Sequence, residues 1–394
     1  MTRRVLSIAT LYPNAAAPRF GTFVARSLEA LAGRDGWEVT VINPIALPPL
    51  ALGRYAALKA AATSGLERGV EVHRQTFRTI PRWGARFNPQ LIARKVLPLA
   101  RQLHARSPFD LVDAQFFYPD GPAAARIAAE LGLPLSIKAR GADVHYWGAR
   151  ADARRQILAA GAQAAGLLAV CGALADDMAA IGLPRDKITL HYTGLDRDRF
   201  RPLQHAQLRR RLGRELAIDL PGGVPVLATV GALIERKGQA LVIEALGDLP
   251  PDTVLLLVGR GEDEAGLRRL AETRGVAGRV HFLGSLDHDL LPLVLSAADA
   301  MVLPSASEGL ANAWVESLAC GTPLVITDAG GAREVVTAPE AGVIVARDPQ
   351  AIAAGVRLIL DEPPARADTA ALAQRFSWQA NGAALASYYA GLLA

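Results

Sequence analysis

The chain has 394 residues, of which 51% are hydrophobic and 21% are charged, so its composition is that of a globular protein and excludes a disordered one. Its length exceeds that of one ordinary domain and suits two. Two cysteines, Cys171 and Cys320, are too few for a disulfide scaffold, and their small or apolar neighbours predict buried free thiols. We therefore expect a reducing, cytoplasmic setting.

The net charge of +5 is unevenly distributed along the chain. Residues 1–190 contain 24 Lys and Arg against 14 Asp and Glu, whereas the remainder contains 19 against 24. The basic residues are densest at 78–106, where Phe, Trp, Ile and Leu lie between them. This pattern predicts either a peripheral surface for an anionic membrane or a solvated helix face. No nucleic-acid-binding motif accompanies the charge, so we expect no nucleic-acid partner.

The opening stretch MTRRVLSIATLYPN has too short an apolar run for a secretory signal. No run of the sequence reaches the roughly 20 apolar residues that span a bilayer. We therefore expect membrane contact, if any, to be peripheral.

Runs rich in Val, Ile and Leu alternate with helix-like stretches along the whole chain. We predict strands at 5–10, 39–44, 110–116, 135–141, 167–172 and 188–194, and then at 226–231, 253–259, 280–284, 300–305, 323–328 and 342–346. This alternation indicates βαβ units and parallel sheets that helices cover on both faces. The sequence therefore predicts an α/β protein of two doubly wound, Rossmann-like domains that face each other across a cleft, with a linker near residues 196–204. Ligands are expected beyond the carboxyl ends of the strands.

Three loops of the second half carry candidate site residues. Lys237, beside Arg236, precedes Gly238 at a helix start, which suits a phosphate or is a solvated basic turn. The Gly259-x-Gly261 turn lacks the third glycine of a dinucleotide fingerprint, which argues against a dehydrogenase. The pair Asp287-x-Asp289 can hold a divalent metal on a diphosphate. Because it stands where a helix begins, we favour helix capping over metal binding.

Two carboxylates flank another expected helix start, near Leu310 or Ala311, in the stretch SEGLANAWVESLACGTP. Glu308 precedes this helix and Glu316 lies about two turns inside it. A helix N-terminus attracts anions, whereas a carboxylate accepts two hydrogen bonds from vicinal hydroxyls. The combination suits a ligand with both phosphate and sugar, although each acid alone is also ordinary surface charge.

The ordered set of motifs resembles the retaining glycosyltransferases of family four, which have the GT-B fold. The resemblance covers nearly the whole chain. It rests on the two Glu with seven residues between them and on the stretches TLYPNAAAPRFGTFVARSLEAL, RGADV, HYTGLDRDRFRP, VGALIERKG, SLACGTPLVITDAGGAREVV and FSWQANGAALASYYAGLLA. It implies an acceptor-side domain over residues 1–196, joined by the C-terminal helix at 377–394, and a donor-binding domain over 204–376.

The resemblance also implies roles for individual residues. Gly21 would let a loop of the first domain approach the diphosphate, Lys237 with Arg236 would bind the diphosphate, and Glu316 would bind the ribose. Glu308 and the amides of the next three residues would hold the donor sugar, while the base would lie near the turn after the 280–284 strand. These residues are Gly309, Leu310 and Ala311 for the sugar, and Gly284, Ser285 and Leu286 for the base. Lys237, Glu308 and Arg140 are the candidate catalytic residues, and the resemblance implies no metal and no cofactor.

Four positions depart from the family pattern. Ala232 stands where an Arg is usual, so one cation at the leaving group is missing unless Arg236 or another residue replaces it. Arg140 stands where many members have His, and because Arg does not act as a base, that role does not carry over. Arg140 remains a candidate contact for an anion. Thr193 replaces an Asn and Cys171 a Ser, and both look tolerable.

The expected function is therefore transfer of a sugar, with retention, from a UDP- or GDP-sugar to a hydroxyl of a glycan or lipid-linked acceptor, as in bacterial polysaccharide biosynthesis. Two alternatives stay open: a non-catalytic nucleotide-sugar-binding partner of a biosynthetic complex, which Ala232 and Arg140 motivate, and a GT-B-type sugar-nucleotide epimerase. The base, sugar, acceptor and linkage are not readable from the sequence.

Overall fold

The computed structural model describes residues 2–79, 85–203, 208–218, 220–221, 223–287 and 289–394. These residues form two compact units, which are described separately below. Unit 1 comprises residues 1–194 and 378–394, and unit 2 comprises residues 195–377. No helix of the described chain is both long enough and apolar enough to cross a bilayer.

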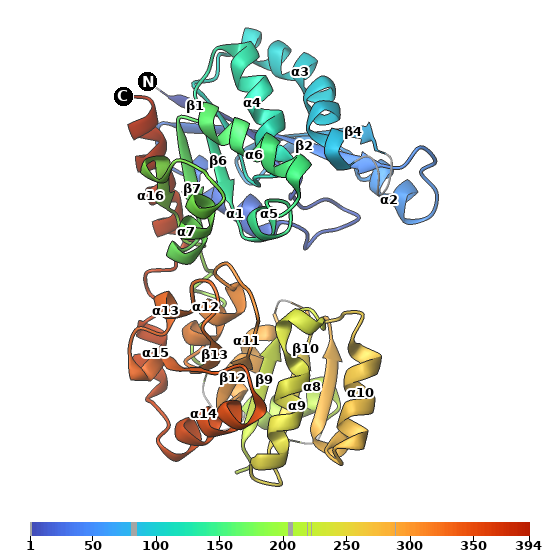
Figure 1. Ribbon diagram of the computed structural model, residues 1–394, viewed down its shortest axis with the longest axis vertical. Coiled ribbons are helices and arrows are strands. Elements are labelled where there is room, and N and C mark those ends of the chain that lie inside the picture. The colour runs from blue at the N-terminus through green and yellow to red at the C-terminus, as the bar shows by residue number, and fades with distance from the viewer. Residues whose placement is uncertain (1, 80–84, 204–207, 219, 222, 288) are drawn as a thin grey trace. The chain divides into compact units, whose positions relative to one another are not determined.

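Unit 1 is built on a sheet of eight strands in the order β3-β4-β2-β1-β5-β6-β7-β8 (Figure 1). Its strands are β1 Arg3–Ile8, β2 Trp37–Leu47, β3 Gly65–Glu67, β4 Val70–Arg78, β5 Leu111–Ala114, β6 Leu135–Ala139, β7 Gly166–Ala169 and β8 Ile188–Leu190. Its helices are α1 Thr22–Ala32, α2 Arg54–Ala60, α3 Asn88–Arg106, α4 Asp120–Leu131, α5 Ala142–His145, α6 Ala151–Gln163, α7 Gly172–Ala180 and α16 Trp378–Leu392. The ladders are parallel except for the β3–β4 pair.

The six strands predicted for the first half are all present, but β3 and β4 were not predicted. β4 reads VEVHRQTFR, in which buried and partly exposed positions alternate from Val70 to Arg74 and polar side chains break the apolar run. Such alternation is typical of a half-exposed strand, which is harder to recognise than a buried one. The missed strands extend unit 1 beyond β2 and create the connection that carries α2.

Unit 2 has a six-stranded parallel sheet in the order β11-β10-β9-β12-β13-β14. Its strands are β9 Val226–Val230, β10 Val254–Val258, β11 Val280–Gly284, β12 Ala300–Leu303, β13 Leu324–Thr327 and β14 Gly342–Val345. Its helices are α8 Leu208–Leu216, α9 Gln239–Ala245, α10 Glu264–Thr273, α11 Leu291–Ala297, α12 Asn312–Ala319, α13 Ala332–Val335, α14 Pro349–Asp361 and α15 Arg366–Ala371. All six strands predicted for this half are present.

The continuous apolar runs of unit 2 follow from burial of both faces of its sheet. In β10, Leu255 and Leu257 pack into one core cluster with α9, α10 and α14. Val254, Leu256 and Val258, at every second position of the same strand, point to the opposite face. They pack with α8 and α11. Successive side chains of a strand face opposite sides, so a sheet covered by helices on both sides needs apolar residues at every position.

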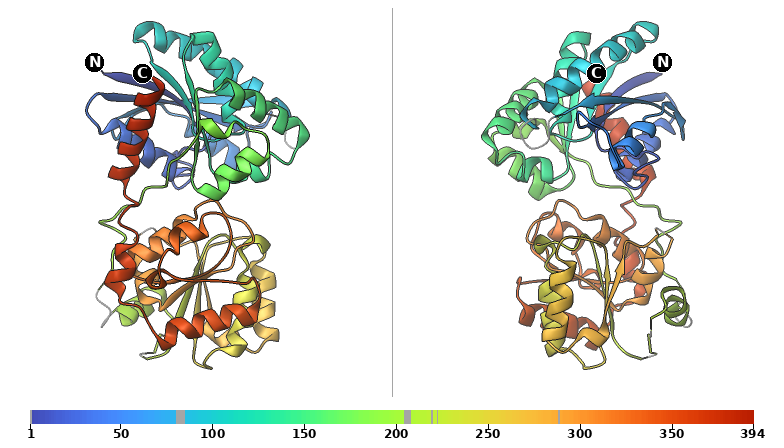
Figure 2. Two further views of the ribbon diagram at one scale, coloured as in Figure 1. Left: turned by 60° about the vertical axis from the view of Figure 1, so that its left-hand side comes forward. Right: turned by 90° about the vertical axis from the view of Figure 1, so that its right-hand side faces the viewer.

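The C-terminal helix α16 belongs to unit 1, although the whole of unit 2 separates it from β8 in the sequence. Figures 1 and 2 show it beside the first strands and α1. A β-carbon built at Gly382 would lie 2.5 Å from the carbonyl oxygen of Ala30, so only glycine permits this close packing of α16 on α1. The ring of Tyr389 packs 6.1 Å from that of Trp37. Helix α16 is therefore part of the core of unit 1.

Asn381 connects α16 to two other segments of unit 1 through buried hydrogen bonds. Its Oδ1 accepts from the Ser27 hydroxyl at 2.7 Å, and its Nδ2 donates to the carbonyl of Tyr192 at 2.6 Å. Its own carbonyl accepts a hydrogen bond of 2.9 Å from Nε2 of His191. His191 Nδ1 in turn accepts from Lys138 at 2.5 Å, and burial lowers the pKa of both side chains well below their ordinary values. This network ties α1, β6, β8 and α16 together.

Replacement of Asn381 by Ala should destabilise unit 1, because it leaves buried polar groups without partners. The expected loss is about 1–3 kcal/mol in the free energy of unfolding. Urea unfolding followed by circular dichroism measures this loss. Gln379→Ala, at an exposed position of the same helix, is the matched control and should change stability by less than about 0.5 kcal/mol. Equal effects of the two changes would show that the Asn381 network does not hold α16.

Candidate functional site

The candidate residues of unit 2 follow the carboxyl ends of adjacent strands. Residues 231–238 follow β9, 304–311 follow β12 and 328–331 follow β13. Because β9, β12 and β13 are neighbours in a parallel sheet, these three loops meet at one edge. The topology therefore brings Lys237 and Glu308 together, although 71 positions separate them in the sequence.

Lys237 and Glu308 form an ion pair, in which the Lys237 ammonium group donates a hydrogen bond to Oε1 of Glu308. The two side chains are 13% and 8% exposed, so little solvent screens their attraction. Arg236 approaches the other carboxylate oxygen at 3.6 Å, with a side chain that is 45% exposed. A carboxylate with two cations thus lies at the carboxyl edge of the sheet.

The loop that carries Lys237 is fixed against the loop that carries Glu308. Gly238 has a φ of 75°, and a β-carbon there would lie 2.4 Å from the carbonyl oxygen of Pro304. Ala306 N–H donates to the carbonyl of Arg236 at 2.8 Å, and the Arg236 guanidinium donates back to the carbonyl of Ser307. The glycine after Lys237 is therefore required both for the left-handed turn and for the contact between the loops.

A third loop, whose role was not predicted from the sequence, supports Glu308 from the side of β13. Gly330 has a φ of 53°, and a β-carbon there would lie 2.3 Å from the carbonyl oxygen of Glu308. Gly331 N–H donates to the carbonyl of Gly309 at 2.8 Å. The adjacent Gly-Gly in DAGGARE was the available signal, because paired glycines often mark a close approach of two backbones.

Helix α12 begins at Asn312, with Ala311 as its N-cap, so the predicted start at Leu310 or Ala311 was slightly too early. The amides of Gly309, Leu310 and Ala311 precede the helix instead of forming its first turn. Within the described chain, none of these three N–H groups donates a hydrogen bond to a protein acceptor. They remain available beside the Lys237–Glu308 pair, and such clustered free amides suit an anion.

Glu316 lies in the middle of α12 and is partly buried. Its carboxylate has no hydrogen bond or ion pair with any described residue. Burial raises the pKa of Glu316 to about 7. An unpaired carboxylate in such surroundings is unfavourable for folding, so a binding role would explain its presence better than stability does.

The loops after β9 and β10 meet at a glycine-rich contact. A β-carbon at Gly259 would lie 1.8 Å from the carbonyl oxygen of Gly231, and one at Gly261 would lie 2.0 Å from that of Leu233. These glycines therefore allow two loops to touch. Gly284 has a φ of 63° and begins the predicted base-binding turn, which continues through Ser285 and Leu286.

Arg260 was not singled out from the sequence, yet it lies beside this turn. A β-carbon built at Gly284 would be 3.5 Å from Nε of Arg260, whose side chain is exposed. The signal was weak, because an Arg that follows a Gly-x-Gly turn is an ordinary loop residue.

The capping interpretation of Asp287 and Asp289 is wrong. Helix α11 begins only at Leu291, and its N-cap, Leu290, has no side-chain cap. Asp289 instead forms an exposed ion pair with Arg199 at 3.1 Å. The residue between the two acids lies outside the described residues. Among the residues that the structure describes, no group of three or more His, Cys, Asp or Glu side chains is arranged to hold a metal ion.

In unit 1, Gly21 lies at the start of α1 with a φ of 70°. A β-carbon there would lie 2.4 Å from the carbonyl carbon of Leu11, in the same loop. The glycine is therefore needed to close this loop, whether or not a ligand approaches it.

Arg140 follows β6 and is held by several contacts. Its guanidinium donates to the carbonyl of Gln115 at 2.8 Å and to Oε1 of the same residue at 2.6 Å, and it lies 4.7 Å from the ring centre of Phe23. Asp143, fully buried, accepts from the amides of Arg140, Gly141 and Phe117. Burial lowers the pKa of Arg140 to about 10, so it stays charged at neutral pH. It is positioned as a fixed cation at the carboxyl edge of its sheet.

The basic segment 78–106 is only partly described, because residues 80–84 lie outside the described residues. One face of α3 packs into unit 1; its buried residues are Pro89, Ile92, Ala93, Val96, Ala100 and Leu103. Arg101 pairs with Glu130 and Arg106 pairs with Glu71. Helix α3 therefore presents a charged face, and Phe87, just before it, is 48% exposed. The membrane interpretation of segment 78–106 stays a prediction. Both cysteines are buried and free, as predicted.

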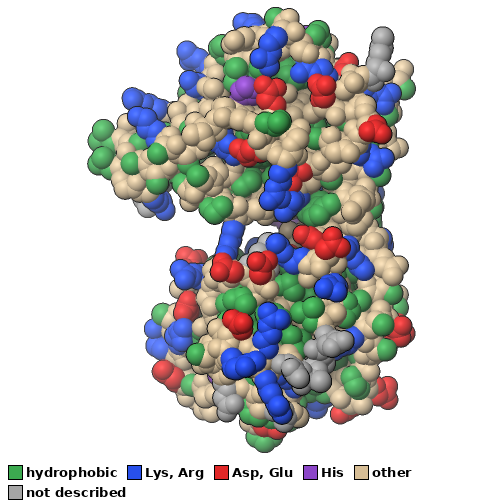
Figure 3. Space-filling model, turned by 180° about the vertical axis from the view of Figure 1, so that it is seen from behind, with side chains coloured by type: hydrophobic (Ala, Val, Ile, Leu, Met, Phe, Trp, Pro, Cys, Tyr) green, Lys and Arg blue, Asp and Glu red, His purple; other side chains and the backbone are tan. Residues whose placement is uncertain are grey.

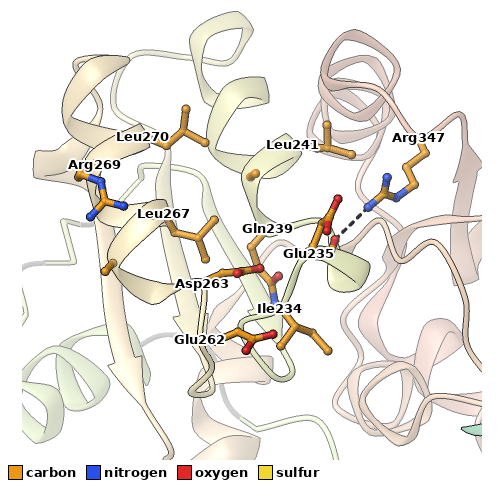
Figure 4. A pocket seen from close by; sticks show the side chains of 14 residues that line it. Ile234, Glu235, Gln239, Leu241, Glu262, Asp263, Leu267, Arg269, Leu270 and Arg347 are labelled. Carbon is orange, nitrogen blue, oxygen red and sulfur yellow. Dashed lines mark hydrogen bonds between the residues drawn. The ribbon is translucent and has the colours of Figure 1, made fainter.

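A pocket of about 520 Å³ lies between α9 and α10, close to the Lys237 loop (Figure 4). Glu235, Glu262 and Asp263 line it, and Arg347 donates to the carbonyl of Glu235 at 3.0 Å on one side. Neither Lys237 nor Glu308 contributes to this pocket. Its three acids outnumber the two arginines of the lining, Arg269 and Arg347, which makes the pocket less suited to a diphosphate. We therefore place the candidate site at the Lys237–Glu308 pair.

Two family models match the chain. Residues 21–199 match the model described as Glycosyltransferase Family 4, and residues 217–376 match Glycosyl transferases group 1. The chain belongs to glycosyltransferase family four. This family is a retaining one, and its GT-B fold agrees with the two parallel α/β sheets described above.

Individual relatives agree with this membership. The chain is 34% identical over 215 residues to a GDP-mannose-dependent alpha-(1-6)-phosphatidylinositol monomannoside mannosyltransferase of Mycolicibacterium smegmatis. The aligned region covers 50% of this chain and 55% of that protein. It is 26% identical over 368 residues to TuaC of Bacillus subtilis, a putative teichuronic acid biosynthesis glycosyltransferase, over 90% of this chain and 88% of that protein. The chain spans about half the length of the first of these relatives.

Among solved structures, HepE of Anabaena in complex with UDP superposes with a TM-score of 0.74 at 20% identity, over 99% of this chain and 100% of that one. This likeness supports the fold.

Glu316→Gln should have opposite effects on stability and on nucleotide binding. A raised carboxyl pKa in the folded state means that stability is highest at low pH and falls as pH rises from about 4.5 through about 7. Removing the charge should therefore stabilise the free protein at pH 8, by about 1–3 kcal/mol. The same change should weaken nucleotide affinity, because an amide accepts fewer hydroxyl hydrogen bonds than a carboxylate.

Thermal unfolding at pH 5 and pH 8, with calorimetric titration of UDP and GDP, measures both effects. Glu235→Gln, at an exposed position in the loop that carries Lys237, is the control. It should alter neither the stability nor the nucleotide affinity. A Glu316→Gln protein that binds nucleotide normally would contradict the assignment of Glu316 to the ribose.

Proposed function

We propose that this protein transfers a sugar from a nucleotide-diphosphate sugar to a hydroxyl of a glycan or lipid-linked acceptor, with retention at the anomeric carbon. The observation that carries the proposal is the shielded Lys237–Glu308 pair, beside three free amides at the carboxyl edge of the unit 2 sheet. One place thus offers positive groups for a diphosphate and a carboxylate for sugar hydroxyls.

Lys237 and the amides of Gly309, Leu310 and Ala311 neutralise the diphosphate in the proposed complex, and Arg236 adds a second cation near them. Its position 3.6 Å from Glu308 lets Arg236 supply the charge that the family pattern usually places at position 232. Glu308 accepts hydrogen bonds from the donor sugar and Glu316 from the ribose. The backbone at Gly284, Ser285 and Leu286 borders the base.

Catalysis rests on stabilising the charge that develops as the sugar–phosphate bond breaks. The transition state resembles an oxocarbenium ion, and negative charge grows on the leaving diphosphate. Fixed positive groups in a poorly solvated place stabilise that charge without reorganising. In the proposed front-face route, the acceptor hydroxyl attacks from the side that the diphosphate leaves, and a leaving phosphate oxygen takes its proton. Lys237 and the amides carry the charge, so we propose a metal-independent reaction.

The relatives support the classes of donor and acceptor. The mycobacterial relative is GDP-mannose-dependent and acts on a phosphatidylinositol mannoside, whereas the HepE structure contains UDP. We therefore propose a UDP- or GDP-hexose as donor. TuaC is named as a putative glycosyltransferase of teichuronic acid biosynthesis, which supports a glycan or lipid-linked acceptor.

Lys237→Ala should lower sugar transfer by about a hundredfold or more, because it removes a cation from the leaving group. Removing one partner of a shielded ion pair also costs stability, so circular dichroism and the unfolding midpoint must accompany the assay. Release of UDP or GDP from a panel of sugar nucleotides, with simple glycosides as acceptors, measures turnover. Lys95→Ala, at an exposed lysine of unit 1, is the matched control and should keep full activity. Normal turnover of a folded Lys237→Ala protein would remove the proposed site.

The product should keep the anomeric configuration of the donor sugar. Proton NMR of the reaction, recorded before the product equilibrates, distinguishes the two anomers by their coupling constants. An inverted product would contradict the retaining mechanism while leaving the donor site intact.

A further inference from the structure

The connection between β2 and β4 exposes leucines that the fold does not use. Leu50 is 78% exposed, Leu52 is 74% exposed, and Leu66 in β3 is 78% exposed. Helix α2 lies in the same connection, packs against β2, and has no buried residue. Apolar side chains exposed together in this way usually mark a contact surface. We call residues 48–60 the α2 projection.

The α2 projection is basic as well as apolar. From residue 44 to residue 66 the only charged residues are Arg54 and Lys59, and both are exposed. Arg54 lies against its neighbour Tyr55, with the guanidinium 4.8 Å from the ring centre. Figure 3 shows hydrophobic side chains at the end of unit 1 that carries α2, at the upper left, with Lys and Arg side chains beside them. The acid that follows Leu66, Glu67, is paired with Arg74. Exposed leucines whose unpaired charged neighbours are basic complement an anionic lipid surface.

An apolar pocket of about 390 Å³ adjoins the α2 projection. Leu58 of α2 lines it, together with Ile45 and Ala46 at the end of β2 and Phe77 at the end of β4. The volume lies within the range of about 300–1,000 Å³ that is usual for small-molecule sites. The pocket therefore adjoins the same connection that carries the exposed leucines.

The other end of this pocket is polar and lies toward the centre of the sheet. Thr10, which follows β1, and Asn43, which lies within the neighbouring strand β2, contribute to its lining. Asn43 is 1% exposed, and its Nδ2 donates to the carbonyl of Ala9 at 2.6 Å. This donation fixes the amide, so that Oδ1 is left without a hydrogen-bond partner among the described residues. A buried acceptor without a partner suits a ligand that brings a hydroxyl group.

We propose that unit 1 binds the lipid part of its acceptor: the α2 projection contacts an anionic membrane surface, and the pocket under α2 takes the apolar chain of a lipid-linked acceptor. The hydroxyl-bearing head then lies toward Asn43 and Thr10, on the sheet edge where Gly21 and Arg140 also lie. The term acceptor rests on the proposed function, but binding of lipid to this surface does not.

Flotation with vesicles tests the surface. The full chain is mixed with vesicles of phosphatidylcholine and phosphatidylglycerol in equal parts, or of phosphatidylcholine alone. The wild type should float with the anionic vesicles, and the Leu50→Asp/Leu52→Asp protein should lose about tenfold or more of its partitioning, because it loses two leucines from the lipid interface. Leu358→Asp, at a leucine of unit 2 that is 54% exposed, is the matched control and should float like the wild type. A wild type that stays in solution, or a double variant that floats normally, would overturn the proposal.

Calorimetric titration with farnesyl phosphate, below its micelle concentration and without nucleotide, tests the pocket. Ala46 is exposed at the pocket wall, so Ala46→Trp should fill the space without disturbing the core and should weaken binding by about tenfold or more. Leu358→Trp should bind as the wild type does. Equal affinity of wild type and Ala46→Trp, or no binding by the wild type, would overturn the proposal. Because neither experiment contains a sugar donor, failure of transfer and failure of lipid binding are separate results.

Discussion

The ion pair between Lys237 and Glu308 is the interaction on which the candidate site depends. It joins the loops after β9 and β12, and both side chains are shielded from water. Two glycines make it possible, because Gly238 and Gly330 bring backbone to backbone where any side chain would collide. In the free protein the charges of Lys237 and Glu308 neutralise each other. A bound sugar diphosphate would give each partner a different task, the cation facing phosphate and the carboxylate facing hydroxyls.

Much of the fold was predictable because burial on two faces leaves a simple pattern. All twelve predicted strands are apolar runs in sheets covered by helices, and all twelve are present. β3 and β4 were missed because polar residues break the apolar run in β4. The position of α12 was wrong by one or two residues, since an alanine without a cap gives no signal for a helix start. The acids at 287 and 289 suggested a cap by residue type alone, but the helix begins too late for either of them.

The candidate site was only partly predictable for a different reason. Lys237, Glu308 and Glu316 were found because their motifs resemble those of a family. Nothing local indicates that Lys237 and Glu308 touch, because that contact follows from strand order. Gly330 and Arg260 were missed, since their roles are backbone contact and placement beside a turn. Arg140, the departure that raised doubt about catalysis, is held by Gln115 and lies next to the buried Asp143, so the substitution is accommodated by its surroundings.

The most direct test of the Lys237–Glu308 site is calorimetric titration of Glu308→Gln with UDP and GDP and with the intact sugar nucleotides. Glu308 offsets the charge of Lys237 in the free protein, so the account predicts that the variant binds the nucleoside diphosphate at least as tightly as the wild type does. It also predicts that the variant loses the additional affinity contributed by the donor sugar. If Glu308→Gln weakens binding of the diphosphate and of the sugar nucleotide by the same factor, Glu308 acts only on the structure of the loop, and the central claim is wrong.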